Sequence, residues 1–263
     1  MMSASGPWSD LVPRVLSGSA LAFVGLGAVG LGGIVFHVFV AIASGVMIWE
    51  LARMLGAGRS ALWIGAGAGL ALLIAIELPG GAALPLVLAP ALLGMSQISA
   101  GRLNFAIFTI AIAIAGFGVV LLRDDFGFVW MAWLACVVIA TDIGGYAAGR
   151  LIGGPKIWPK ISPKKTWSGT VAGWLAAAAI SVPFMAVDGA GWEVIGIAAA
   201  ISMASQLGDV SESALKRQAG VKDSSDILPG HGGLLDRFDS MLGASIFLLL
   251  VEQVVDFPPG MAG

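Results

Sequence analysis

Residues 206–239, which read QLGDVSESALKRQAGVKDSSDILPGHGGLLDRFD, lie between two long apolar runs. They hold ten of the Asp, Glu, Lys and Arg residues, a third of the total, in a chain of 263 residues that is 58% hydrophobic and 11% charged. Charged side chains inside a membrane-embedded segment are costly unless they face a polar cavity or a ligand. This alternation of apolar and charged segments predicts a membrane-embedded chain with a polar binding site.

Apolar runs of roughly 20 residues, about the length needed to cross a hydrocarbon core of ~30 Å, recur along the rest of the chain. The mean hydropathy of +0.94 is too high for a soluble globular domain. Because backbone amides inside lipid must be hydrogen-bonded within their own segment, we expect helices. The predicted fold class is an all-α integral membrane protein with about nine transmembrane helices, near residues 15–31, 34–55, 61–78, 82–95, 103–122, 126–148, 170–187, 192–215 and 234–255.

The basic residues are segregated along the chain, and this predicts the orientation of the helices. Cytoplasmic loops of membrane proteins carry an excess of Lys and Arg. With the amino terminus in the cytoplasm and the carboxyl terminus outside, Arg123 alone falls on the outer side, and the inner side receives Arg14, Arg53, Arg59, Arg102, Arg150, Lys156, Lys160, Lys164, Lys165, Lys216, Arg217, Lys222 and Arg237. Both long polar loops then face the cytoplasm. The net charge of −2, without a broad basic face, argues against a nucleic-acid partner.

A polar stripe runs along the eighth predicted helix. Its members recur at spacings of three and four residues and therefore share one helical face: Ser202, Ser205, Gln206, Asp209, Glu212, Ser213 and Lys216. A charge inside the bilayer costs at least ~2.5 kcal/mol, so this face is predicted to line a protein or water-filled cavity. A stripe that only forms hydrogen bonds between helices is the alternative.

The ninth predicted helix begins with acidic residues. The apolar run from Met241 to Val255 is too short to cross a membrane alone, so the helix is expected to start near Gly233 or Leu234. Asp236 and Asp239 then lie near its first turn, at the positive end of the helix dipole. Two glycines that lead into a helix start, here Gly232 and Gly233, allow backbone N–H groups to approach an anion such as a phosphate closely. Capping carboxylates are the alternative reading of the acids.

Basic residues between these two helices predict phosphate contacts, because Arg forks and Lys charges suit phosphate oxygens. They are Lys216, Arg217 and Lys222, with His231 nearby. An ordinary cytoplasmic anchor is the alternative.

A second polar island runs from Thr141 to Thr170. Asp142 shares a helical face with Gly145, Tyr146 and Gly149. Prolines punctuate the lysines that follow, which predicts an extended basic loop rather than a helix; the lysines are Lys156, Lys160, Lys164 and Lys165. Ser162 or Thr166 is expected to cap the next helix. The loop suits anionic lipid headgroups, a nucleotide triphosphate or only the membrane surface.

Few other polar residues lie within the predicted spans. Glu50 and Arg53 stand three residues apart near the end of the second span, and this spacing predicts an ion pair on the helix surface. His37 and Glu77 are expected to have structural roles.

At this point the motifs resemble a known family. Ser213-Ala-Leu-Lys-Arg217, Lys222-Asp223 and Leu228-Pro-Gly-His-Gly-Gly-Leu-Leu-Asp-Arg-Phe-Asp239 look like the signature of the phosphatidate cytidylyltransferases, also called CDP-diacylglycerol synthases. Asp142, Tyr146, Gly149-Arg150 and Ile161-Ser-Pro-Lys-Lys-Thr-Trp-Ser-Gly169 resemble that family's other common segment. Ser168 departs from the pattern, because many members have Glu there.

The resemblance implies transfer of a cytidylyl group from CTP to phosphatidate, giving CDP-diacylglycerol and pyrophosphate, with Mg²⁺ or another divalent cation. It implies a multi-pass protein of the inner (cytoplasmic) membrane whose active site faces the cytoplasm. Residues 1–263 are then one polytopic membrane domain, with amino-terminal helices in 1–125 and catalytic helices and cytoplasmic loops in 126–263. CTP, phosphatidate and the bilayer are the implied partners, and a homodimer is left open.

Carried over to this sequence, the family's residues divide into two groups. The implied metal ligands are Asp209, Asp236 and Asp239, which together with Lys222 are the implied catalytic residues. The implied substrate-binding residues are Lys164, Lys165, Thr166, Ser213, Lys216, Arg217, His231, Gly232, Gly233, Arg237 and Asp142.

Elementary chemistry supports this reading. The second pKa of a phosphate monoester is ~6, so phosphatidate is largely dianionic at neutral pH and needs no general base; a role for His231 as base is the alternative. The reaction does need neutralisation of two polyanions, which metal ions held by carboxylates on two helices supply. Rival functions are the same transfer to another lipid, an ion-coupled transporter that uses Asp142, Asp209 and Glu212, and a non-catalytic lipid-binding scaffold.

Overall fold

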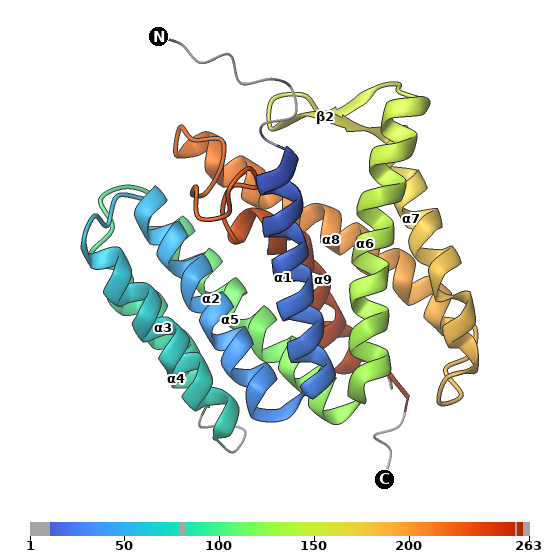
Figure 1. Ribbon diagram of the computed structural model, residues 1–263, viewed down its shortest axis with the longest axis horizontal. Helices are drawn as coiled ribbons and strands as arrows, with labels where there is room; N and C mark the ends of the chain where they lie inside the picture. Colours follow the sequence, from blue (N-terminus) through green and yellow to red (C-terminus); the bar gives the residue numbers. More distant parts are fainter. Residues whose placement is uncertain (1–10, 79–82, 256, 260–263) are drawn as a thin grey trace. The chain divides into compact units, whose positions relative to one another are not determined.

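The computed structural model describes residues 11–78, 83–255 and 257–259, with side chains from residue 15 onward. The predicted turn at Pro79-Gly80-Gly81 and the side chain of Arg14 lie outside the described residues. Within them the chain is built from α-helices, one short 3-10 helix and one two-stranded hairpin, as Figure 1 shows. The predicted all-α class is confirmed, with the hairpin as a small addition.

The helices fall where the apolar runs predict them. They are α1 (Leu11–Leu31), α2 (Gly33–Met54), α3 (Ser60–Glu77), α4 (Ala83–Met95), α5 (Arg102–Asp125), α6 (Gly127–Leu151), α7 (Trp167–Ser181), the 3-10 helix η2 (Val182–Ala186), α8 (Glu193–Gln218) and α9 (Leu235–Glu252). Of the nine predicted spans, each coincides with one α-helix in the described part of the chain.

Six of the described helices are long and apolar enough to cross a membrane, namely α2, α3, α5, α6, α7 with η2, and α8. The apolar parts of α1 and α4 are shorter. Helix α9 begins with Asp236, Arg237 and Asp239, which interrupt its apolar character. Large apolar side chains such as Phe23 (81% exposed) and Trp63 (77% exposed) point away from the protein, as lipid-facing residues do. These features support a multi-pass membrane protein, in which six described helices rather than the predicted nine have the length and hydropathy of a span.

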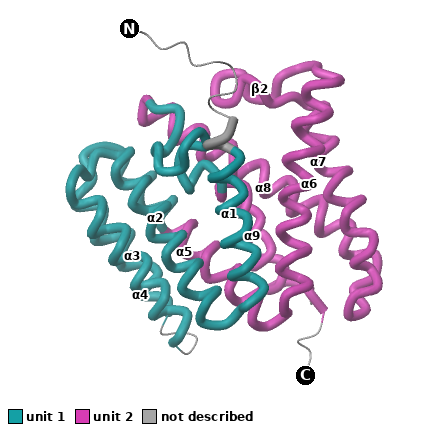
Figure 2. Tube along the Cα trace, in the orientation of Figure 1, with its two compact units in different colours: residues 1–109, 221–237 teal, residues 110–220, 238–263 magenta. Residues whose placement is uncertain are grey.

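The chain divides into two compact units, which Figure 2 colours separately. The first comprises residues 1–109 and 221–237. In it α2 packs against α1 and α3, and α3 packs against α4. Its buried side chains include Phe36, Ile48, Leu51 and Leu72. Residues 221–237, which contain a large part of the predicted site, belong to this unit although they follow α8 in the chain.

The second unit comprises residues 110–220 and 238–263. In it α6 and α8 both pack against α7, around a core that includes the buried Trp130, Trp133 and Leu134. Inside this core the indole N–H of Trp133 donates to the hydroxyl of Ser181 over 2.9 Å. Because polar groups buried among apolar side chains need partners, this bond fixes how α6 and α7 pack.

The lysine-rich loop is a hairpin. Strands β1 (Lys156–Trp158) and β2 (Ser162–Thr166) pair antiparallel, with Lys156 opposite Thr166 and Trp158 opposite Ser162. The prediction of an extended basic segment is confirmed. The sequence did not predict that the two halves of this segment pair as strands. Thr166 caps α7, because its hydroxyl accepts the N–H of Gly169 over 3.2 Å. The hairpin therefore joins the end of α6 to the start of α7 (Figure 1).

Candidate functional site

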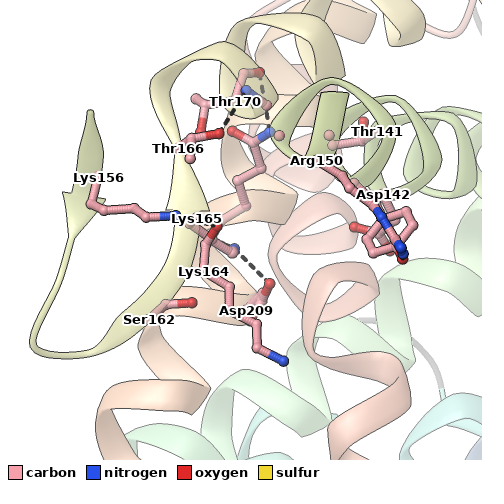
Figure 3. A pocket seen from close by; sticks show the side chains of 15 residues that line it. Thr141, Asp142, Arg150, Lys156, Ser162, Lys164, Lys165, Thr166, Thr170 and Asp209 are labelled. Carbon is pink, nitrogen blue, oxygen red and sulfur yellow. Dashed lines mark hydrogen bonds and ion pairs between the residues drawn. The ribbon is translucent and has the colours of Figure 1, made fainter. Parts of the chain in front are cut away.

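A cavity of about 540 Å³ lies in the second unit, between the hairpin and helices α6, α7 and α8, and Figure 3 shows it from close by. Its lining draws on both predicted polar islands: Thr141, Asp142, Gly145, Tyr146, Gly149, Arg150, Lys156, Ser162, Lys164, Lys165, Thr166, Gly169, Thr170, Gln206 and Asp209. The polar stripe of α8 therefore does face a cavity, as predicted for Gln206 and Asp209. Ser202, deeper in the stripe, has the alternative role, since its hydroxyl accepts a hydrogen bond from the hydroxyl of Thr141 on α6 over 2.8 Å.

An ion pair joins the two islands inside this cavity. The ammonium of Lys165 lies 2.5 Å from Oδ2 of Asp209, and the two side chains point toward each other in Figure 3. Lys165 also donates to the carbonyl of Gln206 over 3.4 Å. The hydroxyl of Ser213, one helical turn beyond Asp209, donates to Oδ1 of Asp209 over 3.3 Å. Residues separated by more than forty positions in the sequence thus share one charged centre.

Further cations line the same cavity. Lys164 and Lys156 come from the hairpin, and Arg150 comes from the last turn of α6. The guanidinium of Arg150 donates to the hydroxyl of Tyr146 over 2.7 Å, and the ammonium of Lys156 donates to the carbonyl of Lys164 over 3.5 Å. Because Lys and Arg supply several N–H donors, this lining suits phosphate oxygens.

Arg150 and Lys156 are cavity residues that the predicted site did not include. The signal for Arg150 is its position four residues after Tyr146, on the helical face that also holds Asp142. The signal for Lys156 is its place among the lysines of the predicted basic loop, and the pairing of β1 with β2 brings it to the cavity.

Helices α8 and α9 cross closely next to Asp209. A side-chain carbon placed on Gly208 would collide with the carbonyl of Asp239, and one placed on Gly243 would collide with the carbonyl of Ala204. Only glycine permits this approach of two backbones. Asp239 consequently interacts electrostatically with Asp209 and with Asp142. Three predicted site residues are thus brought together in the second unit.

Lys216 has a different environment from the other predicted cations. Its ammonium forms an ion pair with Glu212, one turn earlier on α8, and both side chains are largely buried. Lys216 also interacts electrostatically with Asp239. It lies beside the acidic residues of α8 and α9, and it is absent from the lining of the cavity.

Most of the remaining predicted residues lie in the first unit, in the loop before α9 and in its first turn. Oδ2 of Asp236 accepts the N–H of Ser224, the hydroxyl of Ser224 and the N–H of Gly233, each over 2.8 Å. Asp236 is therefore a capping carboxylate, the reading that the sequence left as an alternative. A role as metal ligand stays a prediction.

Arg237 and His231 are held by the same loop. The guanidinium of Arg237 donates to the carbonyl of His231 over 3.1 Å, and the ring of His231 hydrogen-bonds the hydroxyl of Ser17 on α1 over 2.8 Å. Lys222, in the first unit, and Arg217, in the second, are exposed. The substrate roles predicted for these four residues and for Gly232 stay predictions.

The environment of Glu50 differs from the one predicted for it. The sequence suggested a surface ion pair with Arg53, and this is wrong, because the Glu50 side chain is fully buried. Its carboxylate accepts the backbone N–H groups of Leu234 (2.9 Å) and Leu235 (2.7 Å) at the start of α9. The guanidinium of Arg53 lies instead over the ring of Trp49, 4.8 Å from its centre.

The predicted acids do not form a compact metal cluster. Among the described residues no group of three His, Cys, Asp or Glu side chains is placed to hold a metal ion. Asp209 and Asp239 belong to the second unit and Asp236 to the first. Metal binding by these three residues stays a prediction.

The chain resembles known proteins over most of its length. Residues 12–255 match the model of the cytidylyltransferase family. A protein named phosphatidate cytidylyltransferase from Brucella suis biovar 1 (strain 1330) is 46% identical over 142 residues, which cover 52% of this chain and 53% of that protein. Proteins of the same name from Staphylococcus saprophyticus (41% identity; 57% of this chain, 61% of that protein) and Bacillus subtilis (43%; 48% of each) are also similar.

The alignments with these relatives are partial, and the chain spans about half the length of the first curated relatives it matches. The family model, by contrast, covers both polar islands and helix α2 with Glu50. The family resemblance of the motifs is therefore confirmed, and this chain belongs to the cytidylyltransferase family.

Proposed function

We propose that this protein transfers the cytidylyl group of CTP to phosphatidate, giving CDP-diacylglycerol and pyrophosphate. Family membership and the printed names of the relatives support the proposal. The observation that carries it is the cavity of the second unit, which cations from the hairpin and from α6 line together with Asp209. Helices α6, α7 with η2, and α8, which contribute to this lining, are long and apolar enough to span a membrane. Such a site suits a reaction between a membrane lipid and a polyphosphate.

The residues of this cavity suit the chemistry. The lipid phosphate is largely dianionic at neutral pH, since its second pKa is ~6. One of its oxygens attacks the α-phosphorus of CTP, a new P–O bond forms, and the bond to the oxygen that bridges the α- and β-phosphates breaks. Pyrophosphate leaves with the electron pair of that bond. Because the attacking phosphate is already dianionic, it has no proton to lose. Two polyanions must be held together against their repulsion, and Lys165, Lys164 and Arg150 are placed to neutralise them.

A divalent cation, Mg²⁺ or a similar ion, would add charge neutralisation and alignment of the phosphates. Carboxylate oxygens are the ligands such ions prefer. Asp209 and Asp239 fit this role, because they are like charges held close by the helix crossing, and Asp209 already binds a cationic group, the ammonium of Lys165. The resemblance of the motif alone adds Asp236, a residue of the first unit, to the proposed ligands.

The basic residues also support an orientation. With the amino terminus in the cytoplasm and the carboxyl terminus outside, all Lys and Arg residues except Arg123 face the cytoplasm. CTP arrives from that side, and the phosphate of phosphatidate lies at the level of the headgroups. We infer that the site faces the cytoplasm at the inner membrane.

The proposal is tested with purified protein in lipid nanodiscs that contain phosphatidate, supplied with Mg²⁺ and CTP labelled at the α-phosphorus. The expected result is a labelled lipid that appears with pyrophosphate in equal amounts. Nanodiscs that contain phosphatidylcholine instead of phosphatidate are the control. Failure of a correctly folded preparation to label phosphatidate-containing nanodiscs would reject the proposed function.

A further inference from the structure

Glu50 is a buried carboxylate that the proposed reaction does not use directly. It lies on α2, and the groups that donate to it lie more than 170 positions later in the chain, within the same unit. Oε1 accepts the hydroxyl of Ser225 (2.5 Å) and the N–H of Leu234 (2.9 Å). Oε2 accepts the N–H of Leu235 (2.7 Å). Both oxygens therefore serve as acceptors for a backbone amide at the start of α9.

These amides belong to the first turn of α9. The first N–H groups of a helix have no carbonyl partner within the helix, and a carboxylate placed there is favoured by the helix dipole. In this protein the carboxylate comes from a different helix. Glu50 thus connects α2 to the helix start that contains Asp236.

The same loop connects Glu50 to Asp236. The hydroxyl of Ser224 lies 2.8 Å from Asp236 and 3.3 Å from Glu50, so its single proton goes to the nearer carboxylate of Asp236. A side-chain carbon on Gly233 would lie 2.5 Å from Oε1 of Glu50, so only glycine lets the loop close over this carboxylate. Two carboxylates, one on each side of the loop, thus hold residues 224–235 in place.

We propose that Glu50 is a positioning residue for the reaction, which fixes the start of α9 and the loop that holds Asp236. This rests on the proposed function, in which Asp236 contributes to the site. Glu50 does not touch substrate in this role. It acts by restricting the orientations of the Asp236 carboxylate, since a small displacement of a site residue has a large effect on rate.

Glu50→Gln tests this role selectively. The two amides are accepted by different oxygens of Glu50, so in either orientation the new –NH₂ group faces the N–H of Leu234 or that of Leu235. The size of the side chain is kept, and one acceptor becomes a donor. Glu77→Gln is the matched control, because Glu77 lies in the same unit, is paired with His37 over 2.8 Å and is remote from the loop in sequence.

Hydrogen exchange and steady-state kinetics of each purified variant test the positioning role of Glu50. Hydrogen exchange of the peptide that contains Leu234 and Leu235 is expected to speed up by about tenfold or more in Glu50→Gln and to stay at the wild-type rate in Glu77→Gln. The kcat for transfer from CTP is expected to fall by about tenfold or more. The concentration of Mg²⁺ that gives half-maximal activity is expected to rise, while the KM for phosphatidate changes little.

The results of these two measurements separate three claims: the anchoring role of Glu50, its positioning role and the proposed function. Unchanged exchange at residues 234–235 would overturn the anchoring role. Faster exchange with kcat and the Mg²⁺ requirement of the wild type would reduce Glu50 to a structural cap and overturn the positioning role. A folded wild-type protein without activity would overturn the proposed function, and with it the positioning role, whereas the exchange experiment would still decide the anchor.

If Glu50→Gln does not fold, Ser225→Ala takes its place. This substitution removes one donor to Oε1 and leaves the carboxylate intact. Exchange at Leu234 is then expected to speed up, together with a smaller loss of kcat. Wild-type exchange and wild-type kcat in Ser225→Ala would overturn the proposal.

Discussion

At the scale of single residues, hydrogen bonds and ion pairs within each unit fix the charged side chains that the sequence predicts for the site. Lys165 binds Asp209, Asp236 is held by Ser224 and Gly233, and Glu50 holds the amides of Leu234 and Leu235. Each of these contacts joins residues from different elements or from a loop and a helix. A substrate that brings phosphates to the cavity must compete with Asp209 for the ammonium of Lys165.

Asp209→Asn is expected to lower kcat by roughly 10²–10³-fold, the range found when a stabilising group aimed at reacting charge is removed. The substitution keeps the shape of the side chain and removes the charge that pairs with Lys165. Asp188→Asn, in the same unit, is the control, because the Asp188 carboxylate accepts the indole N–H of Trp130 over 2.9 Å and an amide oxygen can accept the same bond. Near-normal turnover in a folded Asp209→Asn protein would contradict the assignment.

Lys165→Ala is expected to raise the KM for CTP or for phosphatidate by about tenfold or more, because a hydrogen bond to a charged group contributes roughly 1.5–3 kcal/mol. Steady-state kinetics with each substrate varied in turn measure the effect. Lys160→Ala is the control, since Lys160 is an exposed lysine of the same hairpin that is absent from the cavity lining. Unchanged kinetics for both substrates would refute a phosphate contact by Lys165.

At the scale of elements, the helices were predictable and their contacts were not. Runs such as Leu103–Leu122 are long and apolar, so span length alone locates a helix there. The strands β1 and β2 escape prediction because their pairing depends on a turn between two short segments with no alternating apolar pattern. The role of Glu50 escapes it because the amides that it accepts lie far along the chain, whereas Arg53 is the neighbour that the sequence displays.

The crossing of α8 and α9 gives a prediction at this scale. Gly208→Ala is expected to destabilise the protein by about 1–3 kcal/mol, the usual effect of overpacking, because the added carbon meets the carbonyl of Asp239. Gly196→Ala on the same helix is the control, because a carbon there meets nothing within 4 Å, and Ala is the better helix former. Thermal unfolding in detergent compares them, and equal stability of the two variants would contradict the close approach.

At the scale of the whole molecule, composition and charge distribution predicted the membrane class and the family motifs predicted the chemistry. Asp209, Asp142 and Lys165 were predicted in two separate islands, and the second unit brings them together because α6, α7 and α8 pack side by side. The metal ligands were expected from the resemblance and from the charge of the two reacting polyanions, and metal binding stays a prediction, since no group of three such side chains is placed to hold an ion among the described residues. Spacing along single helices cannot place carboxylates from different units relative to one another.

The proposed orientation is tested by labelling single cysteines in a Cys136→Ala background. Trp192→Cys, at the start of α8, and Lys160→Cys, in the hairpin, are expected to react with a membrane-impermeant reagent from opposite sides of sealed inverted vesicles, with Lys160→Cys accessible from the cytoplasmic side. The expectation follows from the excess of Lys and Arg on one side of the chain. Labelling of both positions from the same side would exclude the proposed topology.

The central claim is that the α-phosphoryl group of CTP passes to phosphatidate at this site. The most direct measurement compares CTP labelled at the α-phosphorus with CTP labelled at the γ-phosphorus, in parallel reactions on phosphatidate nanodiscs, with the Asp209→Asn protein as a blank. The account predicts that the α label enters the lipid and that the γ label leaves entirely as pyrophosphate. Entry of the γ label into lipid, or release of pyrophosphate without any labelled lipid, would contradict it.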